Sequence, residues 1–137
     1  MGLLTLKRKR ILEQKLGSID AGATVDEAGF VYHIVAPSGA DADTDLTIDE
    51  KLLVVDAWAV MSGAPTAGSD ITVQNGASAI SDTIDVSGGS DKSVFRATTI
   101  DDAQNEIAVA GTLRVATTST GADFPGADVF VLGIKIA

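Results

Sequence analysis

Short apolar runs, separated by small and polar residues, make up most of the chain after residue 29. They are rich in β-branched and aromatic residues, and Gly, Asn, Asp or Pro stands between them. Runs of this kind predict strands. The last one, VFVLGIKI, is almost entirely apolar, which predicts a strand that is covered on both faces. The predicted strands cover residues 30–36, 52–60, 71–74, 77–86, 94–98, 107–110, 112–118 and 129–136.

The polar segments between the runs predict turns and loops. Asn75-Gly76 separates two of the runs, and this dipeptide favours the positive φ angles of a type I′ hairpin turn. Residues 38–50, SGADADTDLTIDE, are expected to form an acidic loop, because Asp, Ser and Gly favour turns. One short helix is expected at residues 101–105.

The number and spacing of the strands predict the fold class. About eight strands without intervening long helices argue against a parallel sheet, whose strands need crossover connections. The predicted fold class is therefore all-β, an antiparallel β-sandwich. A jelly-roll arrangement is favoured over an immunoglobulin-like one, because the chain has no Cys…Trp…Cys framework.

The first 29 residues differ in character from the rest. Residues 3–16, LLTLKRKRILEQKL, are mostly good helix formers, and Gly17 is a natural helix stop. Their apolar residues share one side of a helix only in part, so a short helical or extended arm is expected. We assign residues 1–29 to a basic arm with its Gly/Ala-rich linker and residues 30–137 to a single β-sandwich domain.

Charge divides the chain in a similar way. Residues 1–16 hold five of the 10 basic residues and one of the 19 acidic ones, a net charge of +4 (5 − 1). The remaining residues have a net charge of −13 (5 − 18). An acidic body repels nucleic acid and anionic membranes, so neither a specific nucleic acid nor a membrane is an expected partner. The basic run is not followed by an apolar core, and no signal peptide or membrane span is expected.

Few residues that support catalysis are available. The chain has no cysteine and one histidine, which excludes disulfides, thiolate zinc sites, cysteine nucleophiles and any site that needs two histidines. No phosphate-binding glycine motif occurs. Pairs of aspartates are frequent, but coincidence explains them in a chain with 15 aspartates. We therefore expect no enzyme activity, no cofactor and no metal centre.

Two features favour a structural interpretation without excluding a functional one. His33 lies within a predicted strand, where a hydrogen-bonded histidine or one at a subunit contact is expected. Asp41, Asp43 and Asp45 have the spacing that opens an EF-hand loop, but the sixth position is Leu46 rather than Gly. Solvated surface charge is favoured for this loop. A looser calcium site, with Asp49 and Glu50 as further oxygen donors, stays open as the alternative.

The single tryptophan, Trp58, is expected at the centre of the core, because large rings are scarce in this chain. Asp56 precedes it by two residues, and strict alternation along a strand puts both side chains on one face. Either the strand contains a bulge, or this face meets a partner that pairs with Asp56. Asp56 and Trp58 are therefore candidate residues of an oligomer interface.

Several segments of the β-rich part resemble a known family. They are the W-x-V strand at residues 58–60 with the Gly-rich turn after it, TVQNGASAISDTID at 72–85, RATTIDDA at 96–103 and GTLRV at 111–115. Residues 50–137 with these features resemble head decoration, or capsid cement, proteins of tailed bacteriophages. Members of that family lie close to the major capsid protein, have a β-sandwich or jelly-roll body and are typically trimeric.

The resemblance implies a viral structural protein that is made in the host cytoplasm and becomes part of the virion. It would bind the outer surface of the phage head as a homotrimer, with the major capsid protein as its partner, and stabilise the capsid lattice. The candidate capsid-binding residues, expected to face acidic capsid patches, are Lys7, Arg8, Lys9 and Arg10 of the arm. A carbohydrate-binding or host-adhesion module and a tail or connector subunit stay open as alternatives.

Overall fold

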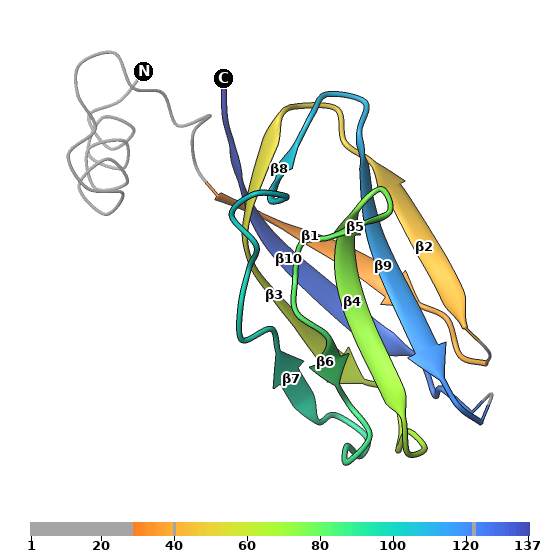
Figure 1. The fold of residues 1–137 in the computed structure, drawn as a ribbon. Coiled ribbons are helices and arrows are strands. Elements are labelled where there is room, and N and C mark those ends of the chain that lie inside the picture. Colours follow the sequence, from red (N-terminus) through yellow and green to blue (C-terminus); the bar gives the residue numbers. More distant parts are fainter. Residues whose placement is uncertain (1–28, 40, 122) are drawn as a thin grey trace, which may run out of the picture.

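The structure is a computed structural model that describes residues 29–39, 41–121 and 123–137. Within these ranges it consists of ten strands and no helix, arranged as two antiparallel sheets that pack face to face (Figure 1). The β-sandwich predicted from the sequence is therefore confirmed. The predicted helix at residues 101–105 is wrong, because the segment forms a turn in which the Asp101 carboxylate accepts a hydrogen bond from the N–H of Ala103. The predicted arm lies almost entirely outside the described residues.

Each sheet has a long strand from the C-terminal part of the chain near its middle. The first sheet, here called the β10 sheet, has the order β1-β10-β3-β7, and β8 also pairs with β3. Its strands are β1 (Gly29–Ala36), β3 (Leu52–Met61), β7 (Val94–Arg96), β8 (Glu106–Ile107) and β10 (Ala127–Lys135). The second sheet, here called the β9 sheet, has the order β2-β9-β4-β5, and β6 also pairs with β4. Its strands are β2 (Ala42–Thr47), β4 (Ser69–Asn75), β5 (Ser78–Ala79), β6 (Ile84–Asp85) and β9 (Thr112–Ser119).

The chain alternates between the two sheets. β1 and β3 lie in the β10 sheet, and β2 and β4 lie in the β9 sheet. Of the last two strands, β10 lies between β1 and β3, and β9 lies between β2 and β4. β5 and β6 pair with the two ends of β4 as pieces of one interrupted strand, and β7 and β8 do the same beside β3. Counted in this way, the strands follow the jelly-roll arrangement.

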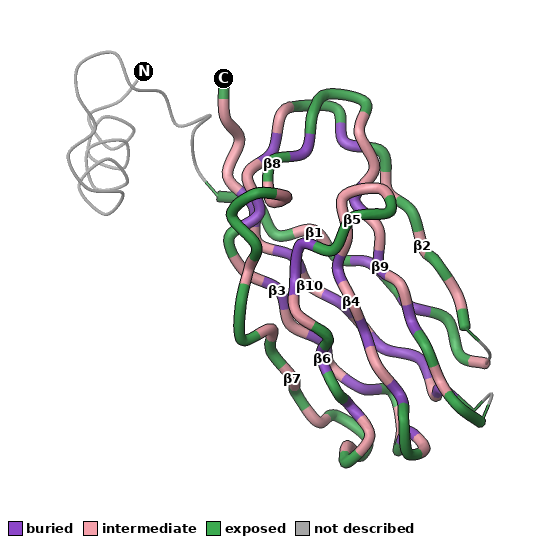
Figure 2. Tube along the Cα trace, viewed as in Figure 1, coloured by how far each residue is buried: buried purple, intermediate pink, exposed green. Residues whose placement is uncertain are grey.

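The core lies between the sheets and is mostly aliphatic. Alternate residues of the central strands are fully buried, such as Val129 and Val131 of β10 and Val115 of β9 (Figure 2). Phe124, in the loop before β10, is the one fully buried aromatic side chain in the described part of the chain. Burial of one aliphatic side chain contributes about 1.5–3 kcal/mol. The core is therefore held by many such side chains rather than by a central ring.

The acidic loop predicted at residues 38–50 is wrong in its middle, because residues 42–47 form β2. This strand lies at the edge of the β9 sheet and pairs with β9. Its exposed carboxylates, Asp43 and Asp45, lie 2.9 and 2.7 Å from guanidinium nitrogens of Arg114. The arginine offsets the repulsion between the two carboxylates, and charge on an edge strand disfavours pairing with other sheets.

The predicted hairpin is present, but its turn is shifted and of another type. Asn75 pairs with Ser78, so Gly76 and Ala77 are the central residues of the turn. Of these two, Gly76 alone has a positive φ, +58°, whereas a type I′ turn requires positive φ at both positions. The strand predicted at residues 77–86 is reduced to the short pieces β5 and β6.

Candidate functional site: an aromatic face on the β10 sheet

The outward side of the β10 sheet carries hydrophobic side chains across four strands. We call this surface the aromatic face. It consists of Val31, His33 and Val35 of β1, Leu53, Val55, Asp56, Trp58 and Val60 of β3, Val94 and Arg96 of β7, and Asp128, Phe130, Leu132 and Ile134 of β10. Of the six large hydrophobic side chains that are exposed in the described residues, four lie on this face. The exposed apolar surface is therefore concentrated rather than scattered.

A bulge in β3 places Asp56 and Trp58 on the aromatic face. The pairing of β3 with β10 skips one residue between Val54 and Asp56. The inward positions shift at this point, so that Val54 and Ala57, three residues apart, are both fully buried. Asp56 and Trp58 share a face, as alternation predicts, and the bulge precedes both of them. The prediction that Trp58 is the centre of the core is wrong.

A row of stacked rings forms the centre of the face. His33, Phe130 and Trp58 are consecutive partners across β1, β10 and β3. The ring centroids of His33 and Phe130 are 4.9 Å apart with planes 13° apart, and those of Phe130 and Trp58 are 5.6 Å apart with planes 15° apart. Each such pair contributes about 0.5–1.5 kcal/mol beyond the area it buries. The stacking therefore orders the three rings before any partner binds.

An ion pair and a hydrogen bond lie beside the row of rings. Arg96 donates hydrogen bonds of 3.0 and 2.6 Å to the two oxygens of Asp56, and this hydrogen bonding, together with the Asp56 charge, raises the pKa of Arg96. His33 Nε2 lies 2.7 Å from Asp128 Oδ1. Asp56 is thus paired within its own chain, without a partner subunit. The prediction of a hydrogen-bonded sheet histidine at His33 is confirmed.

The sequence predicts that strand β10 is covered on both faces, but among the residues that the structure describes nothing packs over its outward face. Its inward residues Val129 and Val131 are fully buried against the β9 sheet, whereas the outward residues Phe130 and Leu132 are half-buried. Sequence reasoning missed Phe130 and Arg96 as members of the face. The signal that could have found Phe130 is the run VFVLGIKI, whose outward positions are as apolar as its inward ones.

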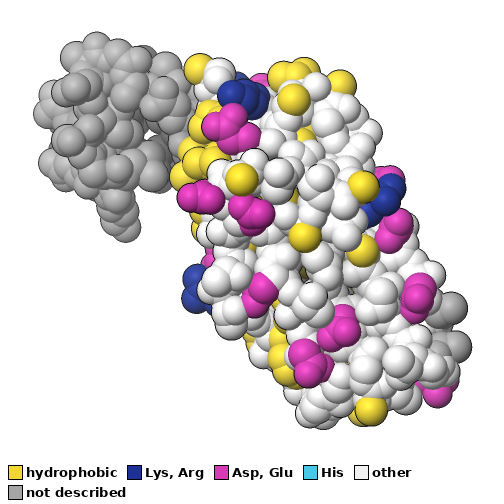
Figure 3. Space-filling model, in the orientation of Figure 1, with side chains coloured by type: hydrophobic (Ala, Val, Ile, Leu, Met, Phe, Trp, Pro, Cys, Tyr) yellow, Lys and Arg dark blue, Asp and Glu magenta, His cyan; other side chains and the backbone are white. Residues whose placement is uncertain are grey.

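The outward side of the β9 sheet has a different chemistry. Its central strands β4 and β9 present polar side chains such as Thr72, Gln74, Thr112 and Thr118. Figure 3 looks onto this side, which is mainly white with scattered acidic side chains, while hydrophobic side chains gather along the left margin. Of the two outward sheet faces that the structure describes, the aromatic face is the one suited to burial against an apolar partner.

Two aspartates oppose each other on the polar side. Asp70 of β4 is the register partner of Asp85 of β6. Burial, and then the charge of Asp85, raises the pKa of Asp70 above its usual value. A carboxylate whose folded-state pKa is raised destabilises the fold above its unfolded-state pKa, and this penalty disappears as the pH falls below it.

We therefore expect Asp70→Asn to increase the free energy of unfolding by about 0.5–1 kcal/mol at pH 7 and to leave it unchanged at pH 3. Urea unfolding followed by Trp58 fluorescence at both pH values measures the difference. Asp102→Asn, a change at an exposed turn, is the matched control and should be neutral at both. A loss of stability in Asp70→Asn at pH 7 would contradict the repulsion.

The acidic residues of the segment for which a calcium site stayed open as the alternative do not converge on a cation site. The Asp41 carboxylate accepts a hydrogen bond from the N–H of Ser119, while Asp43 and Asp45 bind Arg114. Among the residues that the structure describes, no group of three or more His, Asp or Glu side chains is placed to hold a metal ion. The basic arm residues Lys7, Arg8, Lys9 and Arg10 lie outside the described ranges.

The aromatic face holds aromatic residues and an arginine, which are residue types enriched at the centres of protein interfaces. In the described ranges of the chain, no helix has the length and apolar character needed to cross a membrane. Comparisons of the whole chain with models of protein families, with curated proteins and with solved structures found no match.

Proposed function

We propose that this protein is a viral structural protein, a capsid decoration or cement protein that binds the outer surface of a phage head as a homotrimer. The observation that carries the proposal is the aromatic face. Its hydrophobic centre, with polar pairs beside it, has the organisation of a subunit interface, and an exposed surface of this kind favours association. The protein would be made in the host cytoplasm and would act in the virion by contact alone.

In this proposal the aromatic face joins the copies of the trimer. Its 14 residues are enough for the centre of a standard interface, which has about 20–30 residues on each side. Three copies held rigidly together present three capsid-binding surfaces, so contacts that are weak singly become tight together. A trimer that bridges neighbouring capsid subunits in this way would stabilise the lattice.

The charge of the domain is consistent with this role. Residues 29–137 hold 15 acidic and five basic residues, a net charge of −10 (5 − 15). A body with this charge stays soluble and does not bind the packaged DNA. In this proposal, the basic residues of the arm bind the acidic patches on the capsid.

The oligomeric state tests the proposal directly. Sedimentation equilibrium at micromolar concentration is expected to give three times the chain mass of 14.0 kDa. A stable monomer would contradict a trimer joined through the aromatic face. A ring of six copies would point instead to a tail or connector subunit, and a monomer that binds glycans would point to an adhesion module.

The role of the arm gives a second prediction. A variant with residues 7–10 changed to glutamine is expected to bind purified heads of the encoding phage about 10-fold more weakly at low salt, because four cations are lost. Its binding should also depend less on salt. Co-sedimentation with heads over a salt series measures both effects, with Lys92→Gln, a change on the exposed surface of the body, as control. If binding and its salt dependence were unchanged, the arm would not be the capsid contact.

A further inference from the structure

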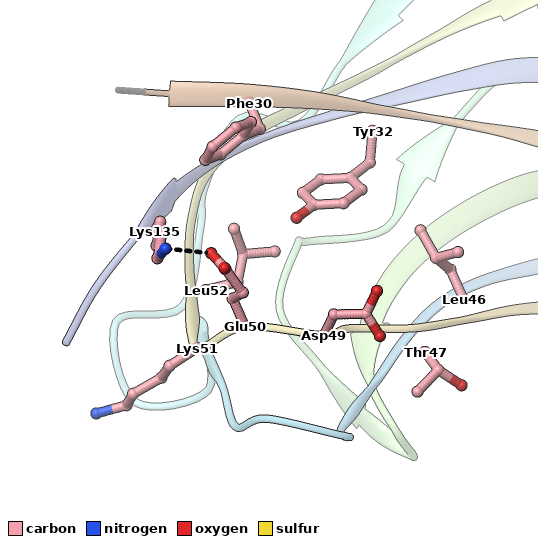
Figure 4. Close-up of a pocket in the computed structure, with 9 residues that line it drawn as sticks. All are labelled: Phe30, Tyr32, Leu46, Thr47, Asp49, Glu50, Lys51, Leu52 and Lys135. Carbon is pink, nitrogen blue, oxygen red and sulfur yellow. Dashed lines mark ion pairs between the residues drawn. The ribbon is translucent and has the colours of Figure 1, made fainter. Parts of the chain in front are cut away.

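A pocket opens at one end of the sandwich, where the edge strands β1 and β2 of the two sheets come together. Its volume is about 550 Å³. Figure 4 shows Phe30 and Tyr32 above the cavity and Asp49 and Glu50 below it, with the Lys51 ammonium pointing away. The complete lining is Phe30, Tyr32, Leu46, Thr47, Asp49, Glu50, Lys51, Leu52 and Lys135.

One wall of the pocket is aromatic and partly open to solvent. Phe30 and Tyr32 occupy inward positions of β1, yet Phe30 is 43% exposed, because none of the described strands covers it at this edge. The Tyr32 hydroxyl forms no hydrogen bond with another residue in the described ranges. Burial, and then the charges of Glu50 and Asp49, raises the pKa of Tyr32. The pocket thus offers two rings and a phenol group to a ligand.

The charges that line the pocket leave one carboxylate without a cation. Lys135 pairs with Glu50 at 2.7 Å, and Lys51 pairs with Glu106, outside the pocket, at 2.9 Å. Asp49 is exposed and forms no ion pair with any residue that the structure describes. A carboxylate beside two aromatic rings favours a cationic side chain, which would gain both an ion pair and a cation–π contact.

The segment before β1 is the occupant that the chain itself can offer this pocket. Gly29 begins β1 and Phe30 lies on the pocket wall, so the described domain begins at the rim of the pocket. Residues 3–16 carry five basic residues among six Leu and Ile residues. The 18 residues from 11 to 28 can span at most about 60 Å, which is ample for folding back to the pocket. A tether of this length keeps the effective concentration high, so even a weak contact is populated.

We propose that the pocket is the binding site for the basic, leucine-containing N-terminal segment of the same chain, with Asp49 as the counter-ion of the tetrad at residues 7–10. The contact forms in the free protein. It does not depend on the aromatic face or on the proposed capsid role, since the pocket lies at the end of the sandwich. A single solvent-exposed ion pair is weak, so a stronger acidic partner of the arm would displace it.

Disulfide trapping in the full-length chain tests the contact. Because the chain has no cysteine, two introduced cysteines are its sole thiols. Leu6→Cys is combined with Thr47→Cys, which lines the pocket, and both changes keep every charge. The matched control combines Leu6→Cys with Thr118→Cys, an exposed threonine near the opposite end of the β9 sheet. A third variant adds Asp49→Lys to the first pair.

The first pair is expected to form a disulfide within one chain at least about 10-fold faster than the control, in line with a locally raised concentration. Asp49→Lys should reduce the rate to that of the control. Non-reducing gels and mass spectrometry measure rates and products. Equal rates for the two pairs, no effect of Asp49→Lys, or disulfide-linked dimers as the main product would each overturn the proposal. The last result would show that the pocket takes the segment of a neighbouring copy.

Discussion

Trp58→Ser is expected to dissociate the proposed trimer into monomers at concentrations at which the unchanged protein is fully assembled. Trp58 lies in the ring row of the aromatic face, stacked on Phe130. Tryptophan at the centre of an interface contributes at least about 2 kcal/mol to binding, which corresponds to about 30-fold in the dissociation constant of each contact. Sedimentation over a dilution series measures the shift.

The result depends on the variant keeping its fold. Loss of one stacked pair lowers the free energy of unfolding by about 1 kcal/mol, which a sandwich of this size tolerates. Val94→Lys serves as a second variant, because Val94 is 63% exposed on the same face and the change leaves the core intact. Val109→Ser, at an equally exposed valine outside the face, is the control. If both Trp58→Ser and Val94→Lys remained trimeric, the copies would be joined by another surface.

Phe124→Ala is expected to lower the free energy of unfolding by about 3–5 kcal/mol, the largest effect of any single truncation that we predict. Phe124 is 1% exposed and is the largest fully buried side chain among the described residues. Its backbone N–H and carbonyl oxygen bind Gly39 at 3.2 and 2.8 Å, so the backbone at Phe124 joins the loop before β10 to the loop after β1, and the buried ring packs beneath this junction. Truncation would leave a cavity and loosen this end of the sandwich.

Chemical unfolding at pH 7 measures the loss. Phe124→Leu is the matched control, and it should lose markedly less stability because it fills most of the same volume. Total stabilities of small domains are about 5–15 kcal/mol, so Phe124→Ala is expected to be partly unfolded at elevated temperature. A loss below about 1 kcal/mol would mean that the neighbouring loops collapse into the space.

Apolar alternation was sufficient to predict the sandwich and most of its strands. The runs that became β1, β3, β9 and β10 are long and rich in β-branched residues, and local preference and burial agree in them. β2 was missed because two of the six residues of ADTDLT are Asp, which normally favours turns. The strand pairs with β9, and Arg114 of β9 binds both aspartates; these are tertiary contacts that composition does not encode.

The candidate site was predictable in part. The spacing of Asp56 and Trp58 indicated that one face of the strand is unusual, but the scarcity of rings argued for a buried Trp58. A one-residue bulge decides whether Trp58 is buried or lies on the outward face, because it reverses which side chains of β3 point inward after it. The pairing of Asp56 with Arg96 was not predictable, since the two residues are 40 positions apart. Phe124 carries no periodic signal because it lies in a loop.

The central place of β10 in its sheet has a consequence for synthesis of the chain. β10 separates β1 from β3, so this sheet has a gap in its middle until β10 has left the ribosome. Until then the nascent chain exposes the edges of β1 and β3 and the apolar residues that later face the core. Long-range pairing of this kind forms slowly, and exposed strand edges promote aggregation. Substitutions that weaken the pairing of β10 should therefore lower the soluble yield in cells by more than equally destabilising substitutions in other strands do.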